Sequence, residues 1–197
     1  MVSPRNHFLY TPLLPSTTVG TLEYKCIQEP VRSIPNLQYR QALAQEIDFE
    51  KKVIKCRPVC PDDYCGMDFE QDYDHLIIAC GMTNSIFKTK GVSQDPVVNQ
   101  ENHIYFLKSL SDAQRIRNRL LDCFEIASNP AMNQEERKKF LNFMIVGGGP
   151  TSCEFAGELA EFIKYDVKAK YPELANQASI TIINKAKQVL PSYASDI

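Results

Sequence analysis

The chain contains 197 residues, of which 44% are hydrophobic, and this suits one large or two small domains with a buried core. Its net charge of −2 and its dispersed Lys and Arg residues argue against a nucleic-acid partner. No run approaches the roughly 18 apolar residues of a membrane-spanning helix, and the seven cysteines, without a disulfide-framework spacing, indicate free thiols in a reducing compartment.

The N-terminal segment is predicted to contain little regular structure. Val2 to Asn6 resemble the end of a strand that turns into a loop, and we expect further sequence to precede them. Pro15-Ser16 offers a helix start and Pro30 offers a stop. These signals predict a short helix or an irregular segment over residues 16–30.

Alternating polar and apolar residues come next and predict a small antiparallel meander. Its three runs are residues 37–43, 46–49 and 52–56. The following loop is rich in Pro and Asp, and the cysteines Cys56, Cys60 and Cys65, with His75, suggest zinc ligands. Structural zinc sites usually come as paired, closely spaced knuckles, so we expect unpaired thiols and no metal.

The middle of the chain predicts two strands and two helices. Tyr73 to Gly81 form an apolar run that ends in glycine, as in a parallel central strand facing a ligand crevice, and Ile104 to Leu107 predict a short strand. Ser111 to Gln114 form a capping box for a helix that ends before Asn129, and a second box at 133–136 opens a short charged helix. The apolar face of the longer helix is predicted to comprise Ile116, Leu120, Leu121 and Phe124.

The most informative stretch is an apolar run, residues 143–146, that breaks into three glycines and continues as a helix to about Tyr171. This order predicts a strand, a phosphate-binding turn and a helix. Gly147 would supply the tight bend, and Gly149 would let the backbone approach a pyrophosphate at the helix N-terminus. Ser152 stands where the pattern has its third glycine, and a glycine-rich turn without a ligand stays the alternative.

Residues 179–183 predict the second strand of a βαβ unit, whose carboxyl end should carry the acid that binds the ribose of NAD. Asn184 occupies that place. Asp166 has nearly the expected spacing but lies in mid-helix, so it receives no role. With Asn184 in place of an acid, no carboxylate repels a 2′-phosphate, and Lys185 and Lys187 supply positive charge nearby. NADPH is therefore a candidate beside NADH. NADH is favoured because an amide still binds a hydroxyl.

Two motifs carry a family resemblance. One runs from Ser3 to Gly20 and includes Tyr10-Thr11-Pro12-Leu13-Leu14-Pro15-Ser16, and the other continues the glycine stretch from Glu154 to Leu159. Together they closely resemble the type II NADH dehydrogenases of fungal and plant mitochondria, which are single-chain, FAD-dependent NADH:quinone oxidoreductases that do not pump protons. The resemblance covers essentially the whole chain.

The resemblance implies an α/β flavoprotein fold with two Rossmann-like dinucleotide-binding domains, truncated here at both ends. Residues 1–108 would be a partial FAD-binding domain, and residues 109–197 would be a partial NAD(P)H-binding domain. The family's loop for the FAD pyrophosphate would precede Met1, and its membrane-binding region would follow the last residue.

The resemblance also assigns cofactor contacts. Glu154 would face the nicotinamide as the catalytic residue, whereas the alternative is a carboxylate that only stabilises the helix dipole. NAD(P)H would be held by Gly147, Gly148, Gly149, Pro150, Thr151, Glu154 and Asn184. FAD would be contacted by Ser3, Pro4, Arg5, Thr11, Pro12, Leu13, Ala79 and Gly81.

The implied activity is hydride transfer from NAD(P)H to FAD, followed by reduction of ubiquinone at the mitochondrial inner membrane. The full-length protein would touch the membrane through its C-terminal part, and a homodimer is one expected assembly. Without the FAD loop, this chain alone is expected to be inactive. A non-catalytic NAD(P)-binding or scaffold protein is the alternative, and a soluble disulfide reductase is disfavoured because the chain has no Cys-x-x-Cys.

Overall fold

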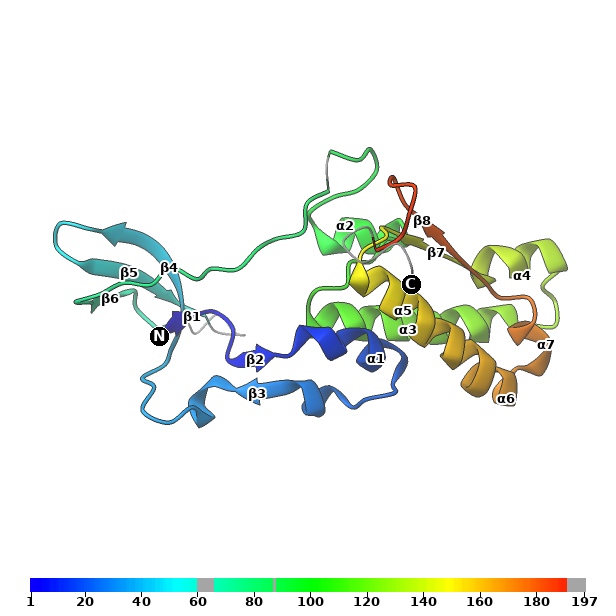
Figure 1. Ribbon diagram of the computed structural model, residues 1–197, viewed down its shortest axis with the longest axis horizontal. Coiled ribbons are helices and arrows are strands. Elements are labelled where there is room, and N and C mark those ends of the chain that lie inside the picture. Colours follow the sequence, from blue (N-terminus) through cyan, green and yellow to red (C-terminus); the bar gives the residue numbers. More distant parts are fainter. Residues whose placement is uncertain (60–65, 87, 191–197) are drawn as a thin grey trace. The chain divides into compact units, whose positions relative to one another are not determined.

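The computed structural model describes residues 1–59, 66–86 and 88–190, and the chain divides into two compact units (Figure 1). The first unit comprises Met1–Leu9 and Gln28–Thr83, and the second comprises Tyr10–Ile27 and Asn84–Ile197. The boundary expected between residues 108 and 109 therefore lies inside the second unit. The expected boundary divides residues assigned to FAD from residues assigned to NAD(P)H, whereas the two units are defined by packing. The division by ligand stays a prediction.

The first unit is built on a four-stranded sheet. Its strands are β1 (Val2–Ser3), β4 (Arg40–Asp48), β5 (Val53–Pro58) and β6 (Phe69–Asp72), of which only β1 and β4 pair in parallel. A separate antiparallel pair joins β2 (His7–Leu9) and β3 (Gln28–Pro30), and a 3₁₀ turn follows at Val31–Ser33. Ala42, Ile54 and Cys56 form the small core of this sheet.

The meander is present, but its strands differ from the prediction. The first two alternating runs belong to one strand, β4, because a bulge between Ala44 and Glu46 keeps both on the same ladder with β5. The third strand is β6, on the far side of the cysteine-containing loop.

Two predicted strands are wrong. Residues 76–86 and 104–107 form neither strand nor helix, and Ile77 is 89% exposed. An apolar run becomes a central strand only when neighbouring strands supply hydrogen bonds on both sides, and none of the strands in the described ranges pairs with either segment. Tyr105 and Leu107 instead pack their side chains against the hydrophobic core of the second unit.

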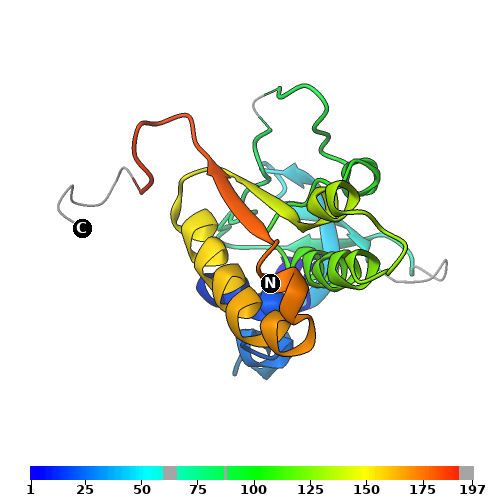
Figure 2. The same ribbon diagram turned by 90° about the vertical axis from the view of Figure 1, so that its right-hand side faces the viewer.

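The second unit is mostly helical. It contains a 3₁₀ turn (Thr11–Leu13), α1 (Leu14–Val19), a 3₁₀ turn (Tyr24–Ile27), α2 (Pro96–Glu101), α3 (Leu110–Ala127) and α4 (Gln134–Leu141). After β7 (Asn142–Val146), helix α5 (Pro150–Phe162) continues through a π-helical turn (Ile163–Val167) into α6 (Lys168–Lys170), and α7 (Pro172–Ala175) precedes β8 (Ser179–Ile183). β7 and β8 pair in parallel with Val146 opposite Ile183, which confirms the βαβ unit (Figure 2).

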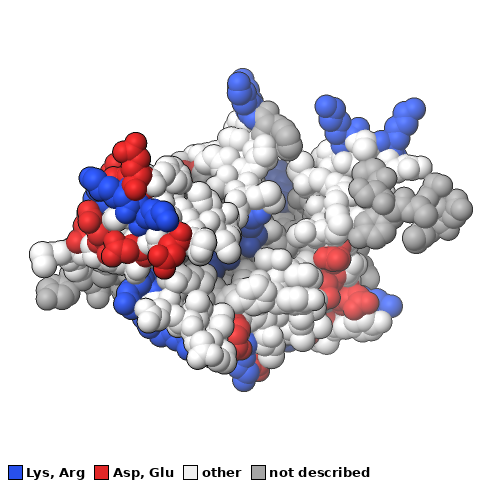
Figure 3. Space-filling model, turned by 60° about the vertical axis from the view of Figure 1, so that its left-hand side comes forward, with Lys and Arg blue, Asp and Glu red and all other residues white. Residues whose placement is uncertain are grey.

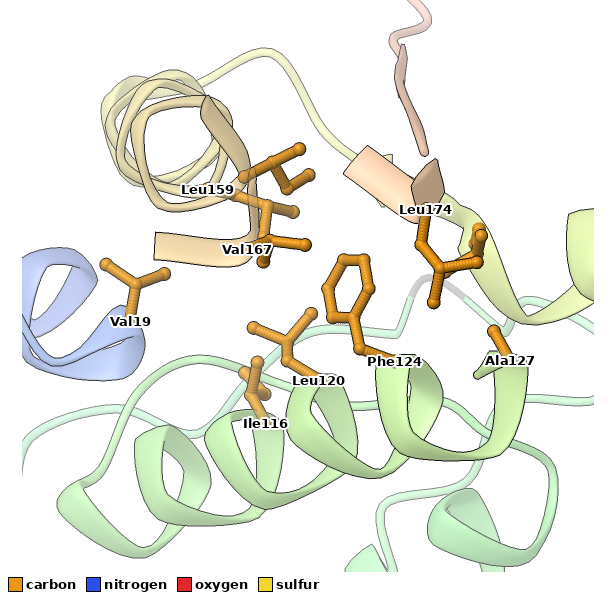
Figure 4. Close-up of a cluster of buried hydrophobic side chains, with 10 residues drawn as sticks. Val19, Ile116, Leu120, Phe124, Ala127, Leu159, Val167 and Leu174 are labelled. Atoms are coloured by element: carbon orange, nitrogen blue, oxygen red, sulfur yellow. The ribbon is translucent and has the colours of Figure 1, made fainter. Parts of the chain in front are cut away.

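The core of the second unit lies where α3 meets α1, α5 and the π turn (Figure 4). Ile116, Leu120 and Phe124 project from α3 into this cluster, as the helical spacing predicts. Leu121 does not join them, because it is 40% exposed on the neighbouring side of the helix. The ring of Phe124 also stacks on Tyr171, so the cluster extends to the end of α6.

Capping residues fix the ends of the two charged helices. The box that opens α3 uses Ser109 and Asp112, two residues earlier than predicted, and Asp112 also pairs with Arg115 at 2.6 Å. Ser109 and Ser111 both have an acid or amide three residues later, and the carboxylate forms the stronger bond to the backbone N–H. The second box, Asn133 with Glu136, is confirmed.

Charges on the face drawn in Figure 3 are mixed, with Lys and Arg scattered among acidic and uncharged side chains. Within the described ranges, every helix is too short or too polar to cross a membrane.

Candidate functional site

The glycine turn connects the end of β7 to the start of α5. Gly147 has a φ of 121°, a conformation that favours glycine, and its N–H donates to the carbonyl oxygen of Ile183 on β8 at 2.8 Å. Gly149 is the N-cap of α5 and, lacking a side chain, forms no side-chain cap. The N–H groups of the first turn, at the positive end of the helix dipole, therefore face the uncovered side of the turn. This arrangement suits a pyrophosphate.

Ser152 is compatible with this turn. Its Oγ lies 3.2 Å from where a Cβ on Gly147 would stand, so the hydroxyl fills the space beside the bend. Around Gly149 nothing lies within 4 Å of an added Cβ. The space over the helix start is therefore open at the one glycine that must let a ligand approach.

Asn184 lies directly against the turn. Its Nδ2 would be 2.4 Å from a Cβ on Gly148, and it donates to the carbonyl oxygens of Gln188 at 2.8 Å and Ala186 at 3.3 Å. The N–H of Leu190 also donates to the carbonyl oxygen of Gly148 at 2.7 Å. The segment after β8 is thereby held beside the glycines, whereas Lys185 and Lys187 are exposed.

A pocket of about 380 Å³ lies along the side of α5. One wall is α5, and the other is the 3₁₀ turn and first turn of α1. Its lining residues are Pro12, Pro15, Ser16, Glu154, Gly157, Glu158 and Glu161. Both walls belong to the second unit, and α1 packs against α5. The pocket brings together Glu154, expected at the nicotinamide, and Pro12, expected at the flavin.

The acidic wall of the pocket follows from helix geometry. Glu154, Gly157, Glu158 and Glu161 recur at helical spacing, so they share one face of α5. Only Glu158 reaches across, and its two carboxylate oxygens accept hydrogen bonds from Ser16 Oγ at 2.6 Å and Thr21 Oγ1 at 2.8 Å. Sequence reasoning missed Glu158 and Gly157, although their spacing from Glu154 is the signal that could have found them.

The residues expected at the FAD divide between the two units. Ser3, Pro4 and Arg5 lie at and after β1, where the carbonyl oxygen of Ser3 accepts from the Tyr39 hydroxyl at 3.1 Å. Thr11 and Leu13 flank Pro12 in the 3₁₀ turn of the second unit. Ala79 and Gly81 lie in the first unit, in the exposed segment without regular structure. The structure therefore groups these residues in three places, and their contacts with FAD stay a prediction.

The zinc alternative can be followed only in part, because Cys60 and Cys65 lie outside the described residues. Within the described ranges, no His, Cys, Asp and Glu side chains gather in a group that could hold a metal ion. Cys56 is buried in the core of the first unit, and burial raises the pKa of its thiol.

Comparison with known proteins matches residues 2–197 to the family described as pyridine nucleotide-disulphide oxidoreductase. The chain is 43% identical over 98% of its length to the mitochondrial external alternative NAD(P)H-ubiquinone oxidoreductase B4 of Arabidopsis thaliana, of which it covers 32%. It is 38% identical over its whole length to the mitochondrial external NADH-ubiquinone oxidoreductase 2 of Saccharomyces cerevisiae, of which it covers 36%. The chain thus spans about a third of the length of these relatives.

Among solved structures, the chain resembles NDH2 from Plasmodium falciparum in complex with NADH, with a TM-score of 0.86 and 33% identity. That match covers all of this chain and 38% of the other. The sulfide:quinone oxidoreductase of Aquifex aeolicus, at 20% identity and a TM-score of 0.60, shares the fold.

Proposed function

The chain belongs to the pyridine nucleotide-disulphide oxidoreductase family, and on that basis we propose that it is the nicotinamide-binding part of an FAD-dependent NAD(P)H:quinone oxidoreductase. One observation carries the proposal: helix α5 both begins at an open glycine turn and lines a pocket with Glu154 and Gly157. The names of relatives that share 38% and 43% of its residues support the same activity.

The glycine turn would hold the pyrophosphate of NAD(P)H. Gly147 sets the bend, and Gly148 lies against Asn184. Gly149 leaves the backbone uncovered, and Pro150 and Thr151 start the helix whose dipole favours the phosphate charge. From this turn the pocket-lining face of α5 leads to Glu154, one helical turn further on. A nucleotide bound at the turn can therefore extend its nicotinamide along that face.

Glu154 would act on charge at the nicotinamide. Its side chain is exposed on the pocket wall, with Pro12 on the opposite wall. A nicotinamide ring becomes cationic when it gives up hydride, and a carboxylate beside it stabilises that charge. The chemistry that bound NAD(P)H and FAD supply is hydride transfer from the first to the second, followed by reduction of a quinone.

Residues from both units would contact the FAD. The pocket volume and the position of Pro12 fit a flat ring system close to α5, so Thr11, Pro12 and Leu13 would contact the isoalloxazine. Ser3, Pro4, Arg5, Ala79 and Gly81 would contact other parts of the FAD. We assign residues 1–108 mainly to FAD and 109–197 to NAD(P)H.

The cellular setting is also proposed. The names of the plant and yeast relatives place those proteins in mitochondria, and we extend this to a peripheral location on the inner membrane. Contact with the membrane and a homodimeric assembly would involve the rest of the full-length protein.

Asn184 favours NADH over NADPH. Its amide nitrogen donates to two main-chain carbonyl groups, and within the described part of the chain no group donates to its side-chain oxygen. That oxygen is an acceptor suited to a ribose hydroxyl. An acceptor cannot hold a 2′-phosphate, so NADPH binding would depend on Lys185 and Lys187.

A single substitution tests nucleotide binding without disturbing the helix. Gly149→Asp places a favourable N-cap residue at the start of α5, so the melting temperature should stay unchanged or rise slightly. The same carboxylate would repel the pyrophosphate, and we expect NADH affinity in calorimetric titration to fall by about 100-fold, or ~2.7 kcal/mol.

Gly66→Asp is the matched control, because it adds the same charge in the first unit, where the nearest atom to an added Cβ is 4.0 Å away. It should leave NADH binding intact. Absence of NADH binding by the wild-type chain, or equal binding by Gly149→Asp, would contradict the proposal.

A further inference from the structure

Among the described residues, Glu158 forms the side-chain hydrogen bonds that cross between the two walls of the pocket. Ser16 and Thr21 lie 142 and 137 residues away in the sequence, and both hydroxyl groups donate to its carboxylate. We propose that Glu158 is a positioning residue: it holds the α1 wall against α5 and so sets the width of the space that receives the nicotinamide. This inference rests on the proposed function of the pocket.

Hydrogen bonds within residues 14–21 hold the α1 side of this contact independently of Glu158. The buried hydroxyls of Thr17 and Thr18 both donate to the carbonyl oxygen of Leu14 at 2.8 Å. The N–H of Thr21 donates to the carbonyl oxygen of Ser16 at 3.0 Å, which brings the two donors of Glu158 side by side. The donors are therefore held in place by α1, and Glu158 contacts both with one carboxylate.

The α5 side gives the contact its effect on the pocket. Glu158 lies one helical turn from Glu154 and directly after Gly157, whose missing side chain leaves open space with nothing within 4 Å of an added Cβ. Pro12 and Pro15, on the same segment as Ser16, face this space. The hydrogen bond between Ser16 and Glu158 therefore sets the distance between the two prolines and α5 at Gly157. A flat ring would approach the helix at this glycine.

Positioning predicts a selective loss of binding. ADP-ribose contains the adenosine and pyrophosphate of NADH but lacks the nicotinamide, so it depends on the glycine turn and not on the pocket. If Glu158 sets the pocket width, its replacement weakens the binding of NADH and leaves the binding of ADP-ribose unchanged. If Glu158 only stabilises the fold, both ligands are affected equally.

The experiment measures the dissociation constants of both ligands by calorimetry for the 197-residue chain and its variants. For Glu158→Ala we expect a loss of about tenfold for NADH and less than about twofold for ADP-ribose. Glu158→Gln keeps one acceptor oxygen and should lie between Ala and wild type. Ser16→Ala combined with Thr21→Val should reproduce Glu158→Ala, and these variants serve if Glu158→Ala does not fold.

Asp166→Ala is the charge control, because Asp166 is exposed in the π turn after α5, and its removal should leave both affinities unchanged. Equal losses for the two ligands, unchanged NADH binding in Glu158→Ala, or an effect of Asp166→Ala matching that of Glu158→Ala would overturn the inference. Wild-type chain that binds ADP-ribose but not NADH would overturn it as well. If wild type binds neither ligand, the proposed function fails first.

Discussion

Gly148 and Asn184 are coupled at the scale of single residues. In Gly148→Ala the added Cβ would stand 2.4 Å from Asn184 Nδ2, so the amide must leave the carbonyl oxygens of Ala186 and Gln188. We expect the free energy of unfolding to fall by about 1–3 kcal/mol in urea titration. Adding Asn184→Ala should recover part of that loss.

Gly157→Ala is the matched glycine control. Gly157 lies within α5 and has nothing within 4 Å of an added Cβ, so alanine should raise the stability by up to about 1 kcal/mol. If Gly148→Ala were as stable as Gly157→Ala, the close packing of Asn184 on the turn would be wrong.

Tyr171 makes the stability depend on alkaline pH. Its hydroxyl donates to the Glu125 carboxylate, and this hydrogen bond, followed by burial and the charge of Glu125, raises the pKa of Tyr171 above 10.0. A raised pKa in the folded state gives stability that is complete below the ordinary pKa and is lost as the pH rises through the folded value. The unfolding free energy of wild type should therefore decline above about pH 10.

Tyr171→Phe removes the titrating group, so its alkaline decline should be shallower than that of wild type. Tyr10→Phe serves as the control, since Tyr10 is 50% exposed, and it should follow wild type. Parallel alkaline curves for wild type and Tyr171→Phe would refute the role of this hydrogen bond.

At the scale of elements, two adjacent leucines of α3 lie on opposite sides of the boundary between core and surface. Leu120 is 5% exposed in the cluster with Phe124, whereas Leu121 is 40% exposed. We expect Leu120→Ala to cost about 2–5 kcal/mol of unfolding free energy and Leu121→Ala less than about 1 kcal/mol. Chemical denaturation of the two variants checks this, and equal costs would mean that the helix is rotated relative to the core.

The apolar run that failed to form a strand gives a second prediction. Residues 76–81 pair with none of the described strands, so their amides should exchange with deuterium within seconds in exchange mass spectrometry. The paired amides of β5 provide the internal reference. Protection of residues 76–81 as strong as that of β5 would show that a strand forms there.

Sequence patterns predicted elements whose signals are local. The apolar run at 143–146, three glycines and Pro150 were enough to define β7, the turn and α5, and the run at 179–183 defined β8. The strand predicted at 73–81 failed because strands depend on partners far away in the sequence. For the same reason, the contact of Glu158 with Ser16 has no local signature, whereas the glycine turn does.

At the scale of the whole molecule, the glycine turn, Asn184 and both walls of the pocket belong to the second unit. We therefore expect NADH to be recognised by this unit. Residues of the first unit would enter the activity through the flavin, and the strands β4, β5 and β6 should not respond to NADH.

The most direct measurement is a titration of the isotope-labelled chain with NADH, followed by NMR of the backbone amides. We expect saturable shifts at residues 147–149, 151–158 and 184, with smaller shifts on the opposite pocket wall, at residues 13–21 other than Pro15, and none at residues 40–58. ADP-ribose should reproduce the shifts at the glycine turn but not those on the pocket wall. Absence of shifts at the turn, or shifts centred on the sheet of the first unit, would mean that the glycine turn does not bind NADH.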